Sequence, residues 1–385
     1  MIIAPAHRTE SVKEYYFSVK NRQIAEMNAD GRTEPVINLG IGAPDGRPPQ
    51  EAIHELCCVA QKNGVHAYQS YTGIPELRRA YAGWYRTWYG VELDYVKEIQ
   101  PLTGSKEGIL IISLAFLNPG DKVLVPDPGY PTYSSAARLC EAQIVTYDLL
   151  EENGWKPDFD ALEKMDLDGV KMMWTNYPGM PTGAPADPEL YRRLVDFGRS
   201  HGILICNDNP YSFILTDKHY SILSVPGAKD CCLELNSLSK AHNMSGWRLG
   251  MVASSAEVIS EVLKVKSQLD SGIFRPLQLA AVKALGQGPE WFASLNAEYA
   301  RRREAAGKIF DLLGAHYSKE SQGLFLWGRV EGDPVGISDS LLRDAGVFIT
   351  PGFIFGNNGK NYLRISLCAP VPVLERALEK IKAVL

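Results

Sequence analysis

The sequence predicts an α/β protein with two parts: a large domain on a mostly parallel sheet covered by helices, and a smaller α+β domain. Short apolar runs alternate with helical segments over residues 98–253, an order typical of parallel sheets. The break Ser271-Gly272-Ile273-Phe274-Arg275-Pro276 precedes two long helices and a mixed pattern. We therefore expect residues 46–272 to form the large domain, and residues 1–45 and 273–385 to form an N-terminal arm plus the small domain.

Composition limits the classes of partner. The chain has 385 residues, 45% of them hydrophobic, enough for two domains. Its 40 basic and 45 acidic residues give a net charge of −5 without a basic block, so neither nucleic acid nor an anionic membrane is an expected partner. The seven cysteines have no metal-site or disulfide spacing. With no signal-peptide pattern or membrane-length apolar run, we expect a soluble, cytoplasmic protein and no metal site.

The spacing of apolar residues, and the Gly and Pro residues that interrupt it, predict where the helices and strands lie along the chain. The N-terminal arm contains one amphipathic helix, and the later helices alternate with strands before the break. Helices are expected at 12–28, 51–61, from 75, from 105, and at 188–201, 256–269, 277–287, 290–313, 336–345 and 371–385. A strand is expected to begin at 35 and to run into a Gly/Pro turn within 35–45. Further strands are expected at 98–102, 122–126, 142–148, 169–176, 203–206, 231–236, 248–253, 324–330, 347–350 and 362–367.

The segment from Ser237 to Gly250 contains the most informative lysine, Lys240. It follows the apolar strand at 231–236, and open α/β sheets bind ligands at the carboxyl ends of their strands. Its flanks are nearly uncharged, unlike those of an ordinary surface lysine, and they supply phosphate donors in Ser237, Ser239 and Arg248. An amine beside an anion site suits a phosphorylated aldehyde cofactor, bound covalently as an imine.

Other polar residues follow predicted strands. Gly104-Ser105-Lys106 begins a helix, which makes it either a phosphate site or an ordinary N-cap. Tyr130 lies on a proline-stiffened turn from which its ring can stack on a flat ligand. Asp208 ends a buried strand, where a carboxylate needs a cationic partner unless it only forms a turn. Arg364 lies in an apolar alternating strand and suits a substrate carboxylate, unless that strand is an edge facing solvent.

Together these motifs resemble the class I/II pyridoxal-phosphate-dependent aminotransferases, of fold type I in the aspartate aminotransferase superfamily. The matching segments extend from residue 36 to residue 367. They are Ser237-Leu238-Ser239-Lys240 with Arg248, Tyr68 before Gly73-Ile74-Pro75-Glu76-Leu77-Arg78, Pro128-Gly129-Tyr130-Pro131-Thr132-Tyr133, Asn207-Asp208-Asn209-Pro210-Tyr211 and Leu363-Arg364-Ile365-Ser366.

The resemblance implies a homodimer with a seven-stranded large domain and pyridoxal 5'-phosphate (PLP) at the domain junction. Lys240 would form the imine and move the substrate α-proton, Asp208 would hold the ring nitrogen protonated, and Tyr211 would contact the ring hydroxyl oxygen. The implied cofactor-binding residues are Gly104, Ser105, Lys106, Tyr130, Asp208, Tyr211, Ser237, Lys240, Arg248 and, from the neighbouring subunit, Tyr68, although Tyr68 could instead be a packing aromatic. Implied substrate contacts are Arg364, Gly42 and Ile41. The activity would be amino transfer from an L-amino acid to a 2-oxo acid, with 2-oxoglutarate and glutamate as the expected pair.

Met180 departs from this resemblance. Family members usually have an asparagine there, whose amide donates a hydrogen bond to the ring hydroxyl oxygen, and a thioether cannot donate. We therefore expect Tyr211 to make that contact largely alone, and the imine to keep its proton to higher pH.

Two other activities fit parts of the pattern. A carbon–sulfur β-lyase uses the same scaffold, but the segment around Pro181 and that from Asn207 to Tyr211 look more like those of transaminases. A cofactor-sensing transcription regulator would need an N-terminal DNA-binding domain, for which we find no room. Arg275 is either a reader of a second substrate carboxylate or a surface arginine. The loop 270–274 resembles diaminopimelate-type transaminases, yet it does not identify the substrate.

Overall fold

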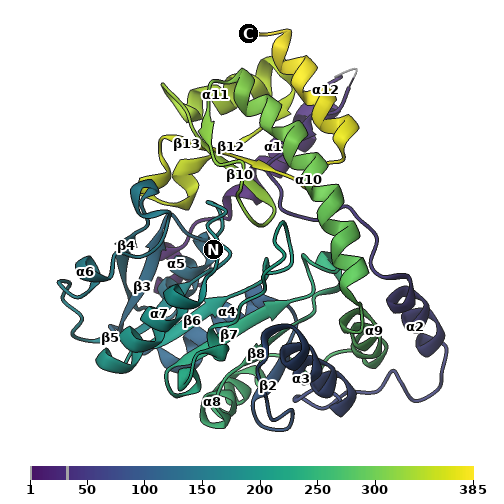
Figure 1. The fold of residues 1–385 in the computed structure, drawn as a ribbon, viewed down its shortest axis with the longest axis vertical. Helices are drawn as coiled ribbons and strands as arrows, with labels where there is room; N and C mark the ends of the chain where they lie inside the picture. Colours follow the sequence, from purple (N-terminus) through teal and green to yellow (C-terminus); the bar gives the residue numbers. More distant parts are fainter. Residues whose placement is uncertain (1, 32–33) are drawn as a thin grey trace.

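The computed structural model describes residues 2–31 and 34–385 and shows two lobes (Figure 1). Met1, Arg32 and Thr33, which belong to the predicted arm, lie outside the described residues. The larger lobe surrounds a central sheet, and the smaller lobe contains α10 (Pro289–Leu312), α11 (Pro334–Ser340) and α12 (Val371–Lys382). No helix in the described part of the chain is long and apolar enough to cross a membrane.

Within the described residues, the central sheet has seven strands in the order β2-β8-β7-β6-β5-β3-β4. β8 runs antiparallel to both neighbours, and the other pairs are parallel. The predicted mostly parallel, seven-stranded sheet is therefore confirmed. Its strands are β2 (Ile99–Leu102), β3 (Lys122–Asp127), β4 (Gln143–Asp148), β5 (Val170–Thr175), β6 (Leu204–Asp208), β7 (Cys232–Ser237) and β8 (Gly250–Ala253).

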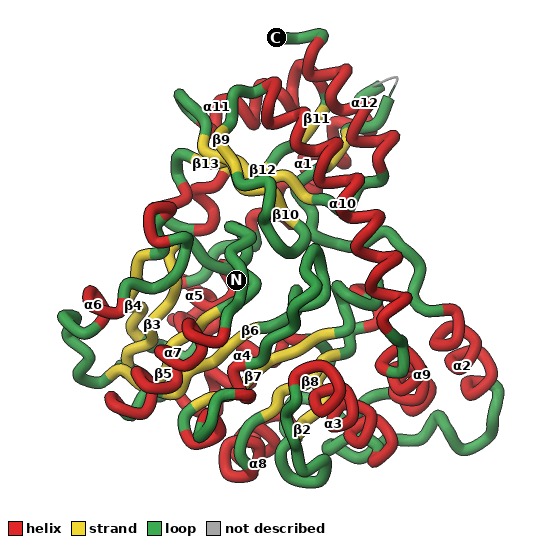
Figure 2. The backbone as a smooth tube through the Cα atoms, viewed as in Figure 1, coloured by secondary structure: helices red, strands yellow, loops and turns green. Residues whose placement is uncertain are grey.

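Helices cover both faces of this sheet (Figure 2). Alternating side chains of β5 show why: Met172 and Trp174 pack into one apolar cluster, whereas Met173 packs into the cluster on the opposite face. The helices of the large lobe are α2 (Gln50–Ala60), α3 (Pro75–Tyr89), α4 (Ser105–Phe116), α5 (Pro131–Leu139), α6 (Phe159–Leu162), α7 (Pro188–His201), α8 (Ala256–Lys266) and α9 (Arg275–Leu285). Because β2, β3, β6 and β7 run in the same direction, the turns after them meet at one edge of the sheet.

The small lobe has its own core and a four-stranded antiparallel sheet, in the order β12-β13-β10-β9. Its strands are β9 (His316–Tyr317), β10 (Phe325–Arg329), β12 (Thr350–Pro351) and β13 (Tyr362–Ser366), and a separate parallel pair joins β1 (Ile37–Asn38) to β11 (Val347–Phe348). Arg364 lies opposite Trp327 on one side and Thr350 on the other. Its strand is therefore internal, which excludes the edge-strand alternative.

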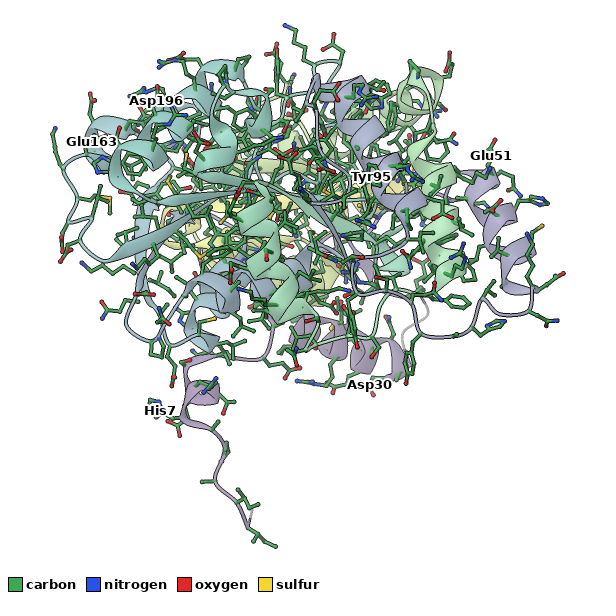
Figure 3. All side chains as sticks on the ribbon, turned by 90° about the horizontal axis from the view of Figure 1, so that it is seen from below. His7, Asp30, Glu51, Tyr95, Glu163 and Asp196 are labelled. Carbon is green, nitrogen blue, oxygen red and sulfur yellow. The ribbon has the colours of Figure 1, made fainter. Side chains whose placement is uncertain are left out.

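The N-terminal arm differs from the prediction. The helix expected to begin at residue 12 begins four residues later, as α1 (Tyr16–Ala29), so the predicted start is wrong. Tyr15 is extended, and its ring lies 4.0 Å from the Lys106 Nζ atom, so a tertiary contact overrides the local helical pattern. Farther out, His7 lies on a segment that projects from the body (Figure 3).

The break before α9 is where we predicted the domain boundary. α9 packs against α2 and α3 of the large lobe, whereas α10 runs from beside α9 to the small lobe (Figure 1). The boundary at residue 272 stays a prediction.

A buried carboxylate joins several elements beneath the sheet edge. Glu234 of β7 has no exposed surface and accepts hydrogen bonds from Tyr85 (2.9 Å), Ser221 (2.8 Å), Asn207 (3.0 Å) and the Ile222 amide (3.1 Å). Burial raises the pKa of Glu234, and these four donors oppose that rise.

Replacing Glu234 should therefore destabilise the fold. Glu234→Ala leaves four buried donors without their acceptor, and we expect the free energy of unfolding to fall by about 3 kcal/mol or more in urea titrations. The control is Glu163→Ala, because Glu163 lies at the periphery (Figure 3) with a side chain 52% exposed. Equal losses in both variants would contradict the role of this network.

Candidate active site

A cavity of about 580 Å³ opens where the small lobe meets the carboxyl edge of the large sheet. It brings together eleven of the thirteen residues that the family resemblance assigns to the cofactor or the substrate, from positions far apart in the chain. They are Ile41, Gly42, Ser105, Lys106, Tyr130, Asp208, Tyr211, Ser237, Lys240, Arg248 and Arg364. Gly104 lies behind this lining, next to Arg248. Tyr68 is not part of the lining, and 90% of its surface is exposed in the single chain.

Lys240 follows β7 and reaches across the cavity. Its Nζ atom donates to the carbonyl oxygen of Gly42, 2.5 Å away. Burial lowers the pKa of the Lys240 amine, and the positive charges of Arg364 and Arg248 act in the same direction. A lowered pKa increases the share of neutral amine, which is the form that attacks a carbonyl carbon.

Asp208 ends β6 with an incompletely paired carboxylate. Its Oδ2 atom accepts a hydrogen bond from the Tyr133 hydroxyl at 3.0 Å, while its Oδ1 atom is buried without a partner among the described residues. Burial raises the pKa of Asp208 to about 7, against the lowering effect of the Tyr133 bond. A cationic N–H group in the cavity would satisfy Oδ1 and favour the carboxylate form.

Hydroxyl, amide and guanidinium donors gather around the beginning of α4. The backbone N–H groups of its first turn are available there, and Ser237 Oγ donates to Ser239 Oγ at 2.8 Å. Arg248 has a left-handed backbone (φ 55°), and a Cβ atom at Gly104 would collide with its guanidinium. Glycine at 104 therefore allows Arg248 to approach the turn, and the donor set fits a phosphate.

Arg364 is a buried cation with weak partners. Its Nη2 atom donates to the Gly40 carbonyl at 2.6 Å, its Nη1 atom lies 3.4 Å from the Met180 sulfur, and its Nε atom has no partner among the described residues. The guanidinium lies 4.0 Å from the Phe325 ring centroid. Burial lowers the pKa of Arg364 to about 10, so it remains charged at neutral pH and can pair with an incoming carboxylate.

Asn176, four residues before Met180, also lines the cavity, and both ends of its amide group bond to the backbone. Its amide group donates to the backbone carbonyl of Asp208 at 2.6 Å, and its Oδ1 atom accepts from the Met180 amide at 2.8 Å. Asn176 therefore holds the turn before Met180 against β6.

Several lining residues were not predicted. Tyr15 and Phe17 come from the arm, whose sequence gives no sign that it covers the cavity, and Phe325 comes from β10. Tyr133 could have been identified, because it ends the same proline-rich motif as Tyr130. Its ring stacks on Trp174 with centroids 5.0 Å apart, which orients its hydroxyl toward Asp208.

These features fit PLP on three counts. The α4 turn with Arg248 fits its phosphate, the unpaired Oδ1 atom of Asp208 fits its ring nitrogen, and the Lys240 amine lies in the same cavity. When bound, PLP supplies an aldehyde carbon for the amine and a ring that withdraws electrons from the substrate α-carbon.

Comparisons with known proteins agree with this geometry. Residues 34–381 match the family described as aminotransferase class I and II. The LL-diaminopimelate aminotransferases of Dehalococcoides mccartyi and Aquifex aeolicus are each 38% identical to this chain, and each match covers 97% of both proteins. Substrate-bound BacF from Bacillus subtilis aligns with a TM-score of 0.93 at 33% identity, over 100% of this chain and 98% of BacF. A Thermus thermophilus aspartate aminotransferase mutant aligns with a TM-score of 0.91 at 26% identity over both whole chains.

The family match covers nearly the whole chain, and the related enzymes are aminotransferases rather than lyases. This chain belongs to the class I and II aminotransferases, and it is a PLP-dependent enzyme that acts on amino acids and 2-oxo acids.

Proposed function

We propose that the enzyme exchanges an amino group between LL-diaminopimelate, or an amino acid of that type, and 2-oxoglutarate, with glutamate as the second product. The first substrate is supported by the related LL-diaminopimelate aminotransferases. Arg364 is buried in the cavity wall and has no carboxylate partner among the described residues, and this carries the proposal that the substrate presents an α-carboxylate.

Each proposed residue has a separate task. Arg364 binds the α-carboxylate and so fixes the α-carbon near Lys240. The Lys240 amine would act as the general base that removes the substrate α-proton and as the acid that returns it on the cofactor side. Asp208 stabilises positive charge at the ring nitrogen, and Tyr211 lies in the same wall to contact the ring oxygen. The α4 turn, Ser237 and Arg248 hold the phosphate.

A second candidate substrate is an amino acid with an aromatic or apolar side chain. Tyr15, Phe17 and Phe325 present rings to the cavity, and Asp208 is the one acidic side chain in the described lining. A distal ammonium group would therefore find hydroxyl and amide oxygens, at Ser18 and Asn21, rather than a carboxylate.

The visible spectrum of the PLP-loaded enzyme separates these candidates. We expect LL-diaminopimelate and glutamate, added singly without an oxo acid, to convert the cofactor band to the amine form and release one 2-oxo acid per site. Faster conversion by phenylalanine or tyrosine would favour the second candidate, and continued release of pyruvate and ammonia would contradict transamination. Lys240→Ala should slow conversion by at least about a thousandfold.

Met180→Asn tests the effect of the missing donor. An amide at position 180 would stabilise the anionic ring oxygen. The pKa read from an absorbance titration of the resting, PLP-loaded enzyme should therefore fall by about one unit, which is a tenfold loss of proton affinity. Met180→Leu is the matched control, since leucine has similar size and no donor, and its spectrum should titrate like that of the parent. An unchanged or raised pKa in Met180→Asn would refute this explanation.

We also propose a homodimer in which Tyr68 completes the neighbour's phosphate site. The supporting observation is a firmly held loop that presents an exposed ring. Lys266, whose side chain is 1% exposed, pairs with Asp270 at 2.8 Å and donates to the Tyr71 carbonyl at 2.6 Å. An exposed aromatic side chain on such a supported loop suits an interface.

Mixed dimers test this arrangement. Tyr68→Phe should weaken PLP binding about tenfold by loss of a charge-assisted hydrogen bond. Tyr95→Phe should not, because the Tyr95 ring packs against Arg78 and Arg79 and is not part of the cavity lining. Mixing Tyr68→Phe with inactive Lys240→Ala subunits should restore activity, because one site of each hybrid contains both native residues. Light scattering that gives a monomer, or hybrids without restored activity, would contradict the proposal.

We propose that the enzyme is cytoplasmic. All seven cysteines are free thiols in the described structure, which suits a reducing compartment.

A further inference from the structure

Residues 39–47, hereafter the 39–47 segment, contact both substrate-facing cations through their backbone. The Gly40 carbonyl accepts from Arg364 at 2.6 Å, and the Gly42 carbonyl accepts from Lys240 at 2.5 Å. Between them, the Ile41 carbonyl accepts from Ser366 Oγ at 2.7 Å. A displacement of this segment would therefore move the acceptors that orient Arg364 and Lys240.

The segment fits closely against the small lobe at its beginning. A Cβ atom at Gly40 would collide with Phe348, and one at Gly42 would collide with Phe325. At its other end, the Arg47 carbonyl accepts from the Asn243 side chain at 3.2 Å. A cavity of about 200 Å³ separates the segment at Asp45 from α10.

One arginine bridges that gap. Arg302 of α10 pairs with both carboxylate oxygens of Asp45, from Nη1 to Oδ1 at 2.6 Å and from Nη2 to Oδ2 at 3.3 Å. The Arg302 side chain is only 8% exposed, and its Nε atom donates to Glu298 at 2.8 Å. A bidentate pair of this kind fixes orientation as well as distance.

Arg302 also holds the end of the strand that carries Arg364. Its Nη1 atom donates to the carbonyls of Cys368 at 3.1 Å and Leu367 at 3.3 Å, directly after β13. The same guanidinium thus contacts the 39–47 segment and the end of the β13 strand, which are the two supports of Arg364.

We propose that Arg302 is a positioning residue for the amino-transfer reaction. Arg302 is not among the residues that line the active-site cavity. Through Asp45 and the turn after β13, Arg302 keeps the Gly40 and Gly42 carbonyls within hydrogen-bonding distance of Arg364 and Lys240. The α-carboxylate is then bound with the α-carbon facing the amine. The inference depends on the proposed roles of Arg364 and Lys240.

The test compares Arg302→Gln with its neighbour Arg301→Gln in the PLP-loaded enzyme. Arg301 is 71% exposed and makes a surface pair with Glu298, so it controls for loss of charge on the same helix. For the best amino-acid donor, we expect Arg302→Gln to raise KM about tenfold with a smaller change in kcat, and Arg301→Gln to change neither. The second probe is the decarboxylated analogue of that donor, which keeps its side chain and amine but lacks the α-carboxylate. This analogue should react slowly, and at the same rate, with the parent enzyme and with Arg302→Gln.

Further variants separate positioning from a merely structural role. Arg302→Lys, which keeps one donor for Asp45, should recover part of the KM loss, and Asp45→Asn should not add to Arg302→Gln in the double variant. Urea titrations identify any variant that fails to fold, and Asp45→Asn, at a 39% exposed side chain, then serves as the milder test.

Arg364→Gln distinguishes the two ways in which this reasoning can fail. If Arg364→Gln does not abolish the preference for the carboxylate-bearing donor over the amine, the proposed role of Arg364 is wrong. If Arg364→Gln abolishes that preference while Arg302→Gln and Asp45→Asn both keep parental KM values, the positioning role of Arg302 is overturned.

Discussion

The active site depends on positive charge that the protein alone does not neutralise. Arg364, Arg248 and Lys240 line one cavity, and Asp208 is the one carboxylate in its described lining. Burying an unpaired charge is costly, and here the cost is reduced by backbone carbonyls and aromatic rings rather than by anions. Such a cavity favours an anionic cofactor and an anionic substrate, which is what phosphate and α-carboxylate groups provide.

The two lobes supply different halves of this arrangement. The parallel strands of the large lobe end together, and this places the α4 turn, Asp208 and Lys240 along one edge. The internal strand β13 of the small lobe holds Arg364 above that edge. The 39–47 segment lies between them and contacts both, so Arg364 of one lobe and Lys240 of the other donate to carbonyls of the same short segment.

The sequence was most informative where function is encoded locally. Strand-end motifs at Ser105, Asp208 and Lys240 predicted the cavity, because strand direction and helix N-termini follow from nearby residues. The seven-stranded sheet came from family resemblance and was confirmed. The start of α1 was predicted wrongly because Tyr15 is held by a contact with Lys106, a residue far along the chain.

Contacts across long separations had no local signal. Asp45 and Arg302 are 257 residues apart, and neither motif nor periodicity pairs them. The contact of Met180 with Arg364 is of the same kind, because the sequence shows the missing donor but not the cation beside the sulfur. The role of Tyr68 requires a second subunit and stays a prediction.

The measurement that tests the central assignment most directly is reduction of the PLP-loaded enzyme with borohydride, followed by peptide mapping. Reduction fixes the cofactor to the lysine that holds it. We predict a single modified peptide carrying the label on Lys240. Label on another lysine of the cavity, such as Lys106, or the absence of any labelled peptide from a PLP-saturated enzyme, would contradict this account of the site.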